Sequence, residues 1–149
     1  MSKRQREDGC TLTELRTESR AEMETWVSHL FASIDAMDAD AFVAHFADDA
    51  VFRFGNGEPA QGRAAVREAL AGFFGAIGGL HHVVTGVWRG EWERGPVLSV
   101  ETAVTYTRAD GSQTPTLPAT STLRLEDGVI QDYRIFVDAA PLFAVTCGG

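Results

Sequence analysis

The chain has 149 residues, of which 44% are hydrophobic and 23% are charged, and its formal net charge is −8. A chain of this length builds one domain around a single core. The acidic balance argues against nucleic acid or an anionic membrane surface as partner, because neither would be neutralised. No apolar run reaches the ~20 residues of a membrane span, and the first residues lack a secretory signal, so we expect a cytoplasmic protein.

The ends of the chain carry little structural information. Residues 1–12 are polar and are predicted to form a flexible tail, as are residues 146–149, which leaves one domain over 13–145. Cys10 and Cys147 stand near opposite ends of the chain and do not have the clustering of a zinc site or a disulfide framework. We therefore expect two free thiols and no metal site.

The first half of the chain shows three helical patterns. From Thr13 onward, apolar residues recur at steps of three and four, at Met23, Val27, Leu30, Ile34 and Met37. Asp38 is a typical N-cap for a second, short helix that buries Phe42, Val43 and Phe46 and closes at the acidic turn Asp48-Asp49. A third helix is predicted over 62–77, where Gly78-Gly79 ends it.

The remaining pattern is typical of strands joined by tight turns. One strand is predicted before the third helix and four after it, at 50–56, 80–88, 97–108, 117–125 and 129–138. Asp110-Gly111 and Asp127-Gly128 are hairpin signals. Helices followed by a meander of strands indicate an α+β domain with its helices on one face of a mostly antiparallel sheet.

The order of these elements resembles a known superfamily. FADDAVF, the following loop, QGRAAVREALAGFF and the ending GVIQDYRIFVD are similar to nuclear-transport-factor-2-like proteins, in particular SnoaL-like polyketide cyclases, ketosteroid isomerases and limonene-epoxide hydrolases. The resemblance covers about residues 20 to 143. It implies a cone in which three N-terminal helices pack on a strongly curved sheet around an apolar pocket, and a homodimer formed through the convex side. It specifies the fold better than the reaction, because this scaffold hosts several activities and also non-enzymes.

The catalytic residues of these relatives are replaced in this chain. The catalytic aspartate of the isomerases falls at Phe54, which cannot transfer a proton, and their acidic oxyanion partner falls at Ser121. The catalytic positions of the epoxide hydrolases read, in chain order, Phe52, Phe54, Glu101, Ala103 and Ile135. Neither mechanism can therefore run as it does in the relatives.

The same comparison implies which strand faces look into the pocket. The matched positions would all line the concave side, and alternation along the strands adds Ala119, Leu123, Tyr133 and Val137. The residue pattern of 97–108 taken alone favours the opposite orientation, because its other face, with Val100 and Val104, is the more apolar one. We follow the resemblance, which turns Glu101 into the pocket.

In that orientation Glu101 is a carboxylate in apolar surroundings, which favour its protonated form and suit a general acid or base. Tyr133 and His82 are predicted to assist it. The substrate-binding residues are predicted to be Phe52, Phe54, Trp88, Ala103, Ser121 and Ile135. His82 can change charge near neutral pH, but the sequence leaves open whether its face is the concave one.

Each of these predictions has a structural alternative. Glu101 could form an ion pair across the sheet with Arg53 or Arg134, and His82 could be a histidine of the core or rim.

Two functions follow from the sequence. The first is an acid–base enzyme without a cofactor, of isomerase, cyclase, dehydratase or hydrolase type, acting on a hydrophobic small molecule in the cone. The second is a non-catalytic module that binds a small molecule or dimerises, since the catalytic residues of the relatives are replaced.

Overall fold

The computed structural model describes residues 20–144 and divides the chain into two parts, one ending at Ala32 and one beginning at Ser33. In the first part the described residues are helical, as the apolar spacing predicts. Outside the described residues lie both cysteines and both predicted tails, Cys10, Cys147, 1–12 and 146–149.

The second part begins with the end of that helix. The helix ends at Asp35 in a Schellman arrangement, in which Met37 N–H donates to Ile34 O at 2.8 Å and Asp38 N–H donates to Ser33 O at 3.0 Å. Met37 takes the left-handed conformation (φ 54°) that glycine usually takes at this position. Asp38 is the predicted N-cap, and its carboxylate accepts from Ala41 N–H at 3.0 Å.

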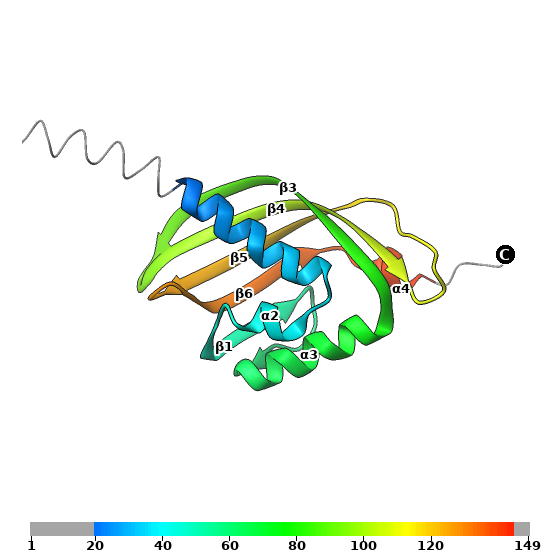
Figure 1. The fold of residues 1–149 in the computed structure, drawn as a ribbon, viewed down its shortest axis with the longest axis horizontal. Helices are drawn as coiled ribbons and strands as arrows, with labels where there is room; N and C mark the ends of the chain where they lie inside the picture. The colour runs from blue at the N-terminus through cyan, green and yellow to red at the C-terminus, as the bar shows by residue number, and fades with distance from the viewer. Residues whose placement is uncertain (1–19, 145–149) are drawn as a thin grey trace, which may run out of the picture. The chain divides into compact units, whose positions relative to one another are not determined.

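The elements after this cap run, in chain order, α2 (Ala39–Val43), β1 (Phe46–Phe54), β2 (Ala60–Gln61), α3 (Arg63–Ala76), β3 (Ile77–Trp92), β4 (Gly95–Arg108), β5 (Leu117–Glu126), β6 (Val129–Val137) and α4 (Ala140–Phe143). The strands form one curved sheet in the order β2-β1-β6-β5-β4-β3 (Figure 1). Every neighbouring pair is antiparallel except β1 and β6, which are parallel. The predicted α+β class is confirmed.

The second helix is shorter than predicted. We expected Phe46 on its buried face and a turn at Asp48-Asp49, but β1 already begins at Phe46. Phe46 pairs with Ile130 of β6, a partner distant in sequence, so tertiary pairing overrides the local helical pattern. The strand β2 and the helix α4 were not predicted.

β4 shows which face of the sheet is the core face. Its even-numbered residues are almost fully buried: Leu98, Val100, Thr102, Val104 and Tyr106. Phe73 of α3 packs on this side against Tyr106 of β4 and Phe54 of β1, with ring centroids 6.1 and 5.4 Å apart. We call this covered side the inner face and the opposite side the outer face.

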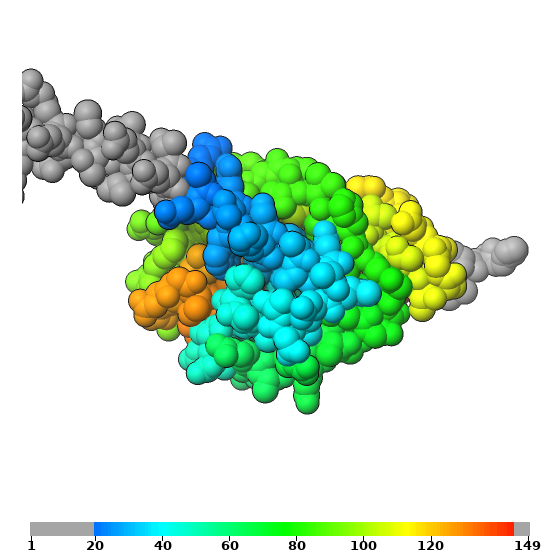
Figure 2. All heavy atoms as spheres, in the orientation of Figure 1, coloured from blue at the N-terminus to red at the C-terminus, as the bar shows by residue number. Residues whose placement is uncertain are grey.

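α2 covers the inner face near β1. Its Phe42 lies in a cluster with Phe46, Phe52 and Tyr133, whose ring centroids are 5.0 to 6.4 Å apart. α2 and α3 also contact one another, and in the space-filling view their cyan and green atoms form a continuous layer (Figure 2). The two helices and the sheet therefore enclose an aromatic core.

Candidate functional site

The predicted inward orientation of Glu101 and Ala103 was wrong. Both lie on the outer face, because they alternate with the buried residues of β4, and the side chain of Glu101 is exposed. Glu101 accepts a hydrogen bond from Thr85 Oγ1 at 3.3 Å and forms no ion pair within residues 20–144, so the alternative pairing with Arg53 or Arg134 is also absent there. The local apolar pattern of β4 indicated the correct face, and the residue-by-residue transfer from the relatives was one position out of phase.

The other predicted inner-face residues are where alternation placed them. Ser121 pairs with Val100, and Ile135 with Ser121, while Tyr133 pairs with Leu123 on the same face. On β1, Phe52 is opposite Tyr133 and Phe54 is opposite Ile135. The inner face is thus confirmed for the following residues: Phe52, Phe54, Ala119, Ser121, Leu123, Tyr133, Ile135 and Val137.

His82 lies on the inner face, which the sequence left open. His82 is opposite Val104 of β4, and Val84 is opposite Thr102. The two β4 residues, Val104 and Thr102, are buried. Only 10% of the His82 side chain is exposed. His82 therefore brings the imidazole to the apolar side of the sheet.

Trp88 lies on the outer face, contrary to the prediction that it lines the binding site. A β-bulge at Thr85 shifts the register between Val84 and Gly86, so Gly86 is opposite Glu101. The extra residue turns Trp88 away from the inner face, and 56% of it is exposed. The prediction assumed an unbroken alternation from His82 to Trp88.

Asp35 holds His82 through two hydrogen bonds. The Oδ1 atom of Asp35 lies 2.6 Å from His82 Nδ1, and its Oδ2 accepts from the backbone N–H of His82 at 3.0 Å. The Schellman ending of the helix fixes Asp35, and β3 fixes His82, so the carboxylate engages ring and backbone together. A carboxylate beside Nδ1 fixes the tautomer in which Nε2 exchanges protons.

Burial lowers the pKa of His82, and the hydrogen bond and charge of Asp35 oppose that shift. The net direction is downward, so the ring is neutral at neutral pH. A neutral imidazole backed by a carboxylate is the arrangement of a general base. His81, by contrast, is 73% exposed, with its Nδ1 3.7 Å from Asp35 Oδ2.

Two residues with hydroxyl groups neighbour His82 in the register of the inner face. Tyr106 and Thr102 stand two residues to either side of Val104, which is opposite His82, so both are its diagonal neighbours across the sheet. Burial raises the pKa of Tyr106 to about 12, so its phenol stays a hydrogen-bond donor at neutral pH. We call Asp35, His82, Thr102 and Tyr106 the inner-face site.

Tyr133 lies deeper in the core than predicted for an assisting group. Its hydroxyl is buried and makes no hydrogen bond within the described residues. Burial raises its pKa far above the ordinary value, the Ser121 hydroxyl acts in the opposite direction, and the Tyr106 phenol adds to the rise.

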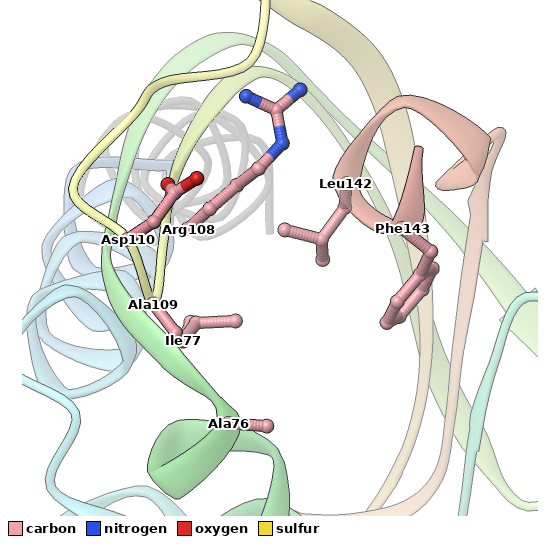
Figure 3. Close-up of a pocket in the computed structure, with 7 residues that line it drawn as sticks. All are labelled: Ala76, Ile77, Arg108, Ala109, Asp110, Leu142 and Phe143. Carbon is pink, nitrogen blue, oxygen red and sulfur yellow. The ribbon is translucent and has the colours of Figure 1, made fainter. Parts of the chain in front are cut away.

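A separate pocket of about 300 Å³ lies beside α4 (Figure 3). Ile77 and Leu142 point into it from opposite sides, with the Arg108 side chain along its edge. Arg108 donates to Ser112 Oγ, to Gln113 O and to Pro141 O at 2.8 to 3.1 Å, while its buried Nε has no acceptor among residues 20–144. Leu142 belongs to the same buried cluster as Tyr106 and Val104, so this pocket adjoins the core that contains part of the inner-face site.

Two further properties hold for the part of the chain that the structure describes. It contains no group of three or more His, Cys, Asp or Glu side chains arranged to hold a metal ion. None of its helices combines the length and the apolar character that a membrane span requires.

The model of the SnoaL-like domain family matches residues 27–133. The chain belongs to this family. No curated protein matches the chain. Solved structures share the nuclear-transport-factor-2-like fold. Their sequence identities to this chain are low, so the similarity establishes the fold and not the activity.

Three of these solved structures illustrate the range. A protein of ketosteroid isomerase-like fold from Catenulispora acidiphila, solved with trimethylamine, is 16% identical, with 78% of this chain and 87% of that one covered (TM-score 0.68). ActVI-ORFA from Streptomyces coelicolor is 20% identical, with 81% and 98% covered (TM-score 0.65). A limonene-epoxide-hydrolase-like epoxide hydrolase from Mycobacterium tuberculosis is 16% identical, with 78% and 83% covered (TM-score 0.62).

Asp35 is the residue of this SnoaL-like domain that sequence reasoning missed. One signal was available, because an acidic residue in the last turn of a helix faces the negative end of the helix dipole. Such a residue is unfavourable unless it has a partner. The partner, His82, is 47 residues away in the chain, and only the fold brings the two together.

Proposed function

We propose that this SnoaL-like domain is an acid–base enzyme that acts on a hydrophobic small molecule, with His82 as its proton-transfer group. The observation that carries the proposal is the 2.6 Å contact between Asp35 Oδ1 and His82 Nδ1 on the mostly apolar inner face. The membership of the family supports a small-molecule enzyme, and the geometry supports His82 as its proton-transfer residue. Glu101 has no part in it.

The reaction that fits these groups is removal of a proton from a carbon next to a carbonyl. His82 Nε2 accepts the proton, and the Asp35 carboxylate stabilises the imidazolium that forms. Negative charge then develops on the carbonyl oxygen, where the protonated phenol of Tyr106 donates a hydrogen bond. Isomerisation, aldol cyclisation and dehydration all share this step.

The apolar inner face supports the choice of a hydrophobic substrate. Val104 and Leu80 flank the site on neighbouring strands, and Phe73 covers it from α3. Removal of water by such walls strengthens the pairing of Asp35 with the charged imidazolium. Phe54, Ser121 and Ile135 remain the substrate-contact residues that we propose further along the same face.

The test uses an activated carbon acid, because it needs no knowledge of the natural substrate. When a base takes the C3 proton of 5-nitrobenzisoxazole, the N–O bond breaks and a coloured cyanophenolate is released. We expect measurable turnover by the wild type and a fall in kcat/KM of at least ~100-fold in His82→Gln, the range that general-base removal produces.

His81→Gln is the matched control, since it removes the neighbouring, exposed imidazole and should leave the rate unchanged. The pH profile of kcat/KM should show a midpoint below 6.5, because the pKa of His82 is lowered from that value. Absence of turnover above background in the wild type, or equal rates in wild type and His82→Gln, would rule out His82 as the base.

A second candidate is a non-catalytic binding module. It is favoured by the replacement of the catalytic positions of the relatives, as at Phe54. In that case a carbonyl ligand such as a cyclic enone would raise the melting temperature of the wild type without being converted.

A further inference from the structure

The outer face carries two arginines in an unusual position, at the parallel pairing of β1 and β6. Arg53 and Arg134 are register partners, and both side chains are exposed on the same side. Like charges directly opposite one another on neighbouring strands repel. In a chain of net charge −8, this arrangement calls for a compensating anion.

The acidic side chains nearby do not supply that compensation. Asp132 pairs with Arg134 at 3.0 Å and with Arg124 at 3.3 Å, so one carboxylate serves two guanidinium groups. Arg53 forms no ion pair within residues 20–144. Among residues 20–144, Asp132 is thus the only carboxylate that forms an ion pair with any of these three guanidinium groups.

The donors of Arg53 and Arg134 are only partly used. Arg53 Nε donates to Gly57 O at 3.1 Å, and its two terminal nitrogens have no acceptor within the described residues. Arg134 uses Nε and Nη2 on Asp132, which leaves Nη1. The remaining N–H groups lie on adjacent strands, where the two oxygens of one carboxylate or phosphate could accept from both residues.

A hollow of about 260 Å³ lies at this position, lined by Arg53, Asn56, Arg134 and Phe136 among others. Phe136 is 58% exposed, although large apolar side chains are usually covered. The hollow thus offers a cationic end and an apolar wall side by side.

We propose that this hollow binds an organic oxyanion, a carboxylate or phosphate monoester whose charged group lies between Arg53 and Arg134 and whose apolar part lies on Phe136. The site is on the opposite side of the sheet from His82 and is independent of the proposed acid–base activity. It is a second binding site of the domain.

Thermal unfolding of the full chain in zwitterionic buffer of constant ionic strength tests this. Benzoate, phenyl phosphate, inorganic phosphate and neutral benzamide are the four probes. We expect benzoate or phenyl phosphate to raise the melting temperature in a saturable way, and benzamide to leave it unchanged. The ratio of the benzoate and phenyl phosphate effects distinguishes a carboxylate site from a phosphate site, and a weaker effect of inorganic phosphate confirms the role of Phe136.

Variants locate the effect. Arg53→Gln and Arg134→Gln should weaken the apparent affinity at least ten-fold, whereas Arg89→Gln, an exposed β3 arginine that does not line the hollow, should retain it. Without any probe, Arg53→Gln should unfold at a higher temperature than the wild type, because it removes the repulsion.

Three results would overturn the proposal. The first is no saturable response of the wild type to either organic anion. The second is equal loss in Arg53→Gln and Arg89→Gln. The third is a lower melting temperature of probe-free Arg53→Gln together with a smaller species on a sizing column, which would mean that a carboxylate of a second copy already fills the position.

Discussion

Asp35 is placed to do two jobs at once, because its two oxygens engage the ring and the backbone of the same residue. Removing its side chain would leave both donors of His82 without this acceptor, at a cost of ~1–3 kcal/mol for each buried group. The pair therefore stabilises the end of the helix on β3 as well as setting the imidazole tautomer. Structural and chemical roles coincide in one contact.

The lowered pKa of His82 predicts how stability depends on pH. An unfolded histidine titrates near 6.5, whereas the folded ring takes up its proton only at lower pH. Below pH 6.5 the unfolded state therefore binds more protons than the folded state, and the free energy of unfolding falls as the pH falls. Urea midpoints between pH 7.5 and pH 5 should show this loss in the wild type.

His82→Gln should remove that component of the slope, and His81→Gln should keep it. A wild type that becomes more stable on acidification, or three identical profiles, would contradict the lowered pKa. This measurement needs no substrate.

Residue-level prediction succeeded where a local pattern carried the information. The alternation of β5 and β6 placed Ser121 and Tyr133 correctly, and the apolar even positions of β4 indicated the true inner face. Glu101 was misplaced because a transferred alignment was preferred to that local pattern, and a shift of one residue reverses the face of every side chain. The partnership of Asp35 and His82 could not be predicted, since nothing local links them.

At the scale of elements, the hairpin between β5 and β6 has the predicted turn. Asp127 and Gly128 both have positive φ, 53° and 80°, as a type I′ turn requires. Gly128→Ala should therefore lower the free energy of unfolding by ~1 kcal/mol, although a methyl group there would meet no atom within 4 Å.

Gly72 in α3 is the matched control, because a methyl group there would also meet no atom within 4 Å. Gly72→Ala should raise the free energy of unfolding by ~0.5–1 kcal/mol, since alanine favours a helix interior. Urea unfolding at one pH measures both. Changes of the same sign in the two variants would show that backbone conformation does not control these positions.

Elements were harder to predict where distant pairing competes with local preference. The residues Phe46 to Asp49 fit a helix end, yet they join β1 because β6 offers a parallel partner. α4 follows Asp138, whose carboxylate accepts a hydrogen bond from Ala140 N–H. This short-range signal was available in the sequence, but Pro141 was interpreted only as the end of a strand. The sequence therefore predicted the class and order of the main elements correctly but misplaced some of their boundaries.

At the scale of the whole molecule, the outer face of β3 is suited to self-association. Val83 and Trp88 are 52% and 56% exposed there, an apolar surface that a second copy could cover. We expect a species of twice the 16.1 kDa chain mass on a calibrated sizing column at micromolar concentration.

Trp88→Arg should shift that species to the mass of one chain. Phe143→Arg, which changes an even more exposed ring on α4, should not. Elution of the wild type at the mass of one chain across the concentration range would contradict the predicted dimer.

The added residue at Thr85 has a consequence for how this domain can vary. It exchanges the two faces of the strand, so that even-numbered residues such as His82 face inward before it and odd-numbered residues such as Val87 face inward after it. Deleting Thr85 would rotate one of the two segments by half a turn, and either the imidazole would leave its carboxylate or the indole would be driven inward. A substitution of the outward-facing Trp88 can therefore change the outer surface of β3 while the contact between His82 and Asp35 is kept.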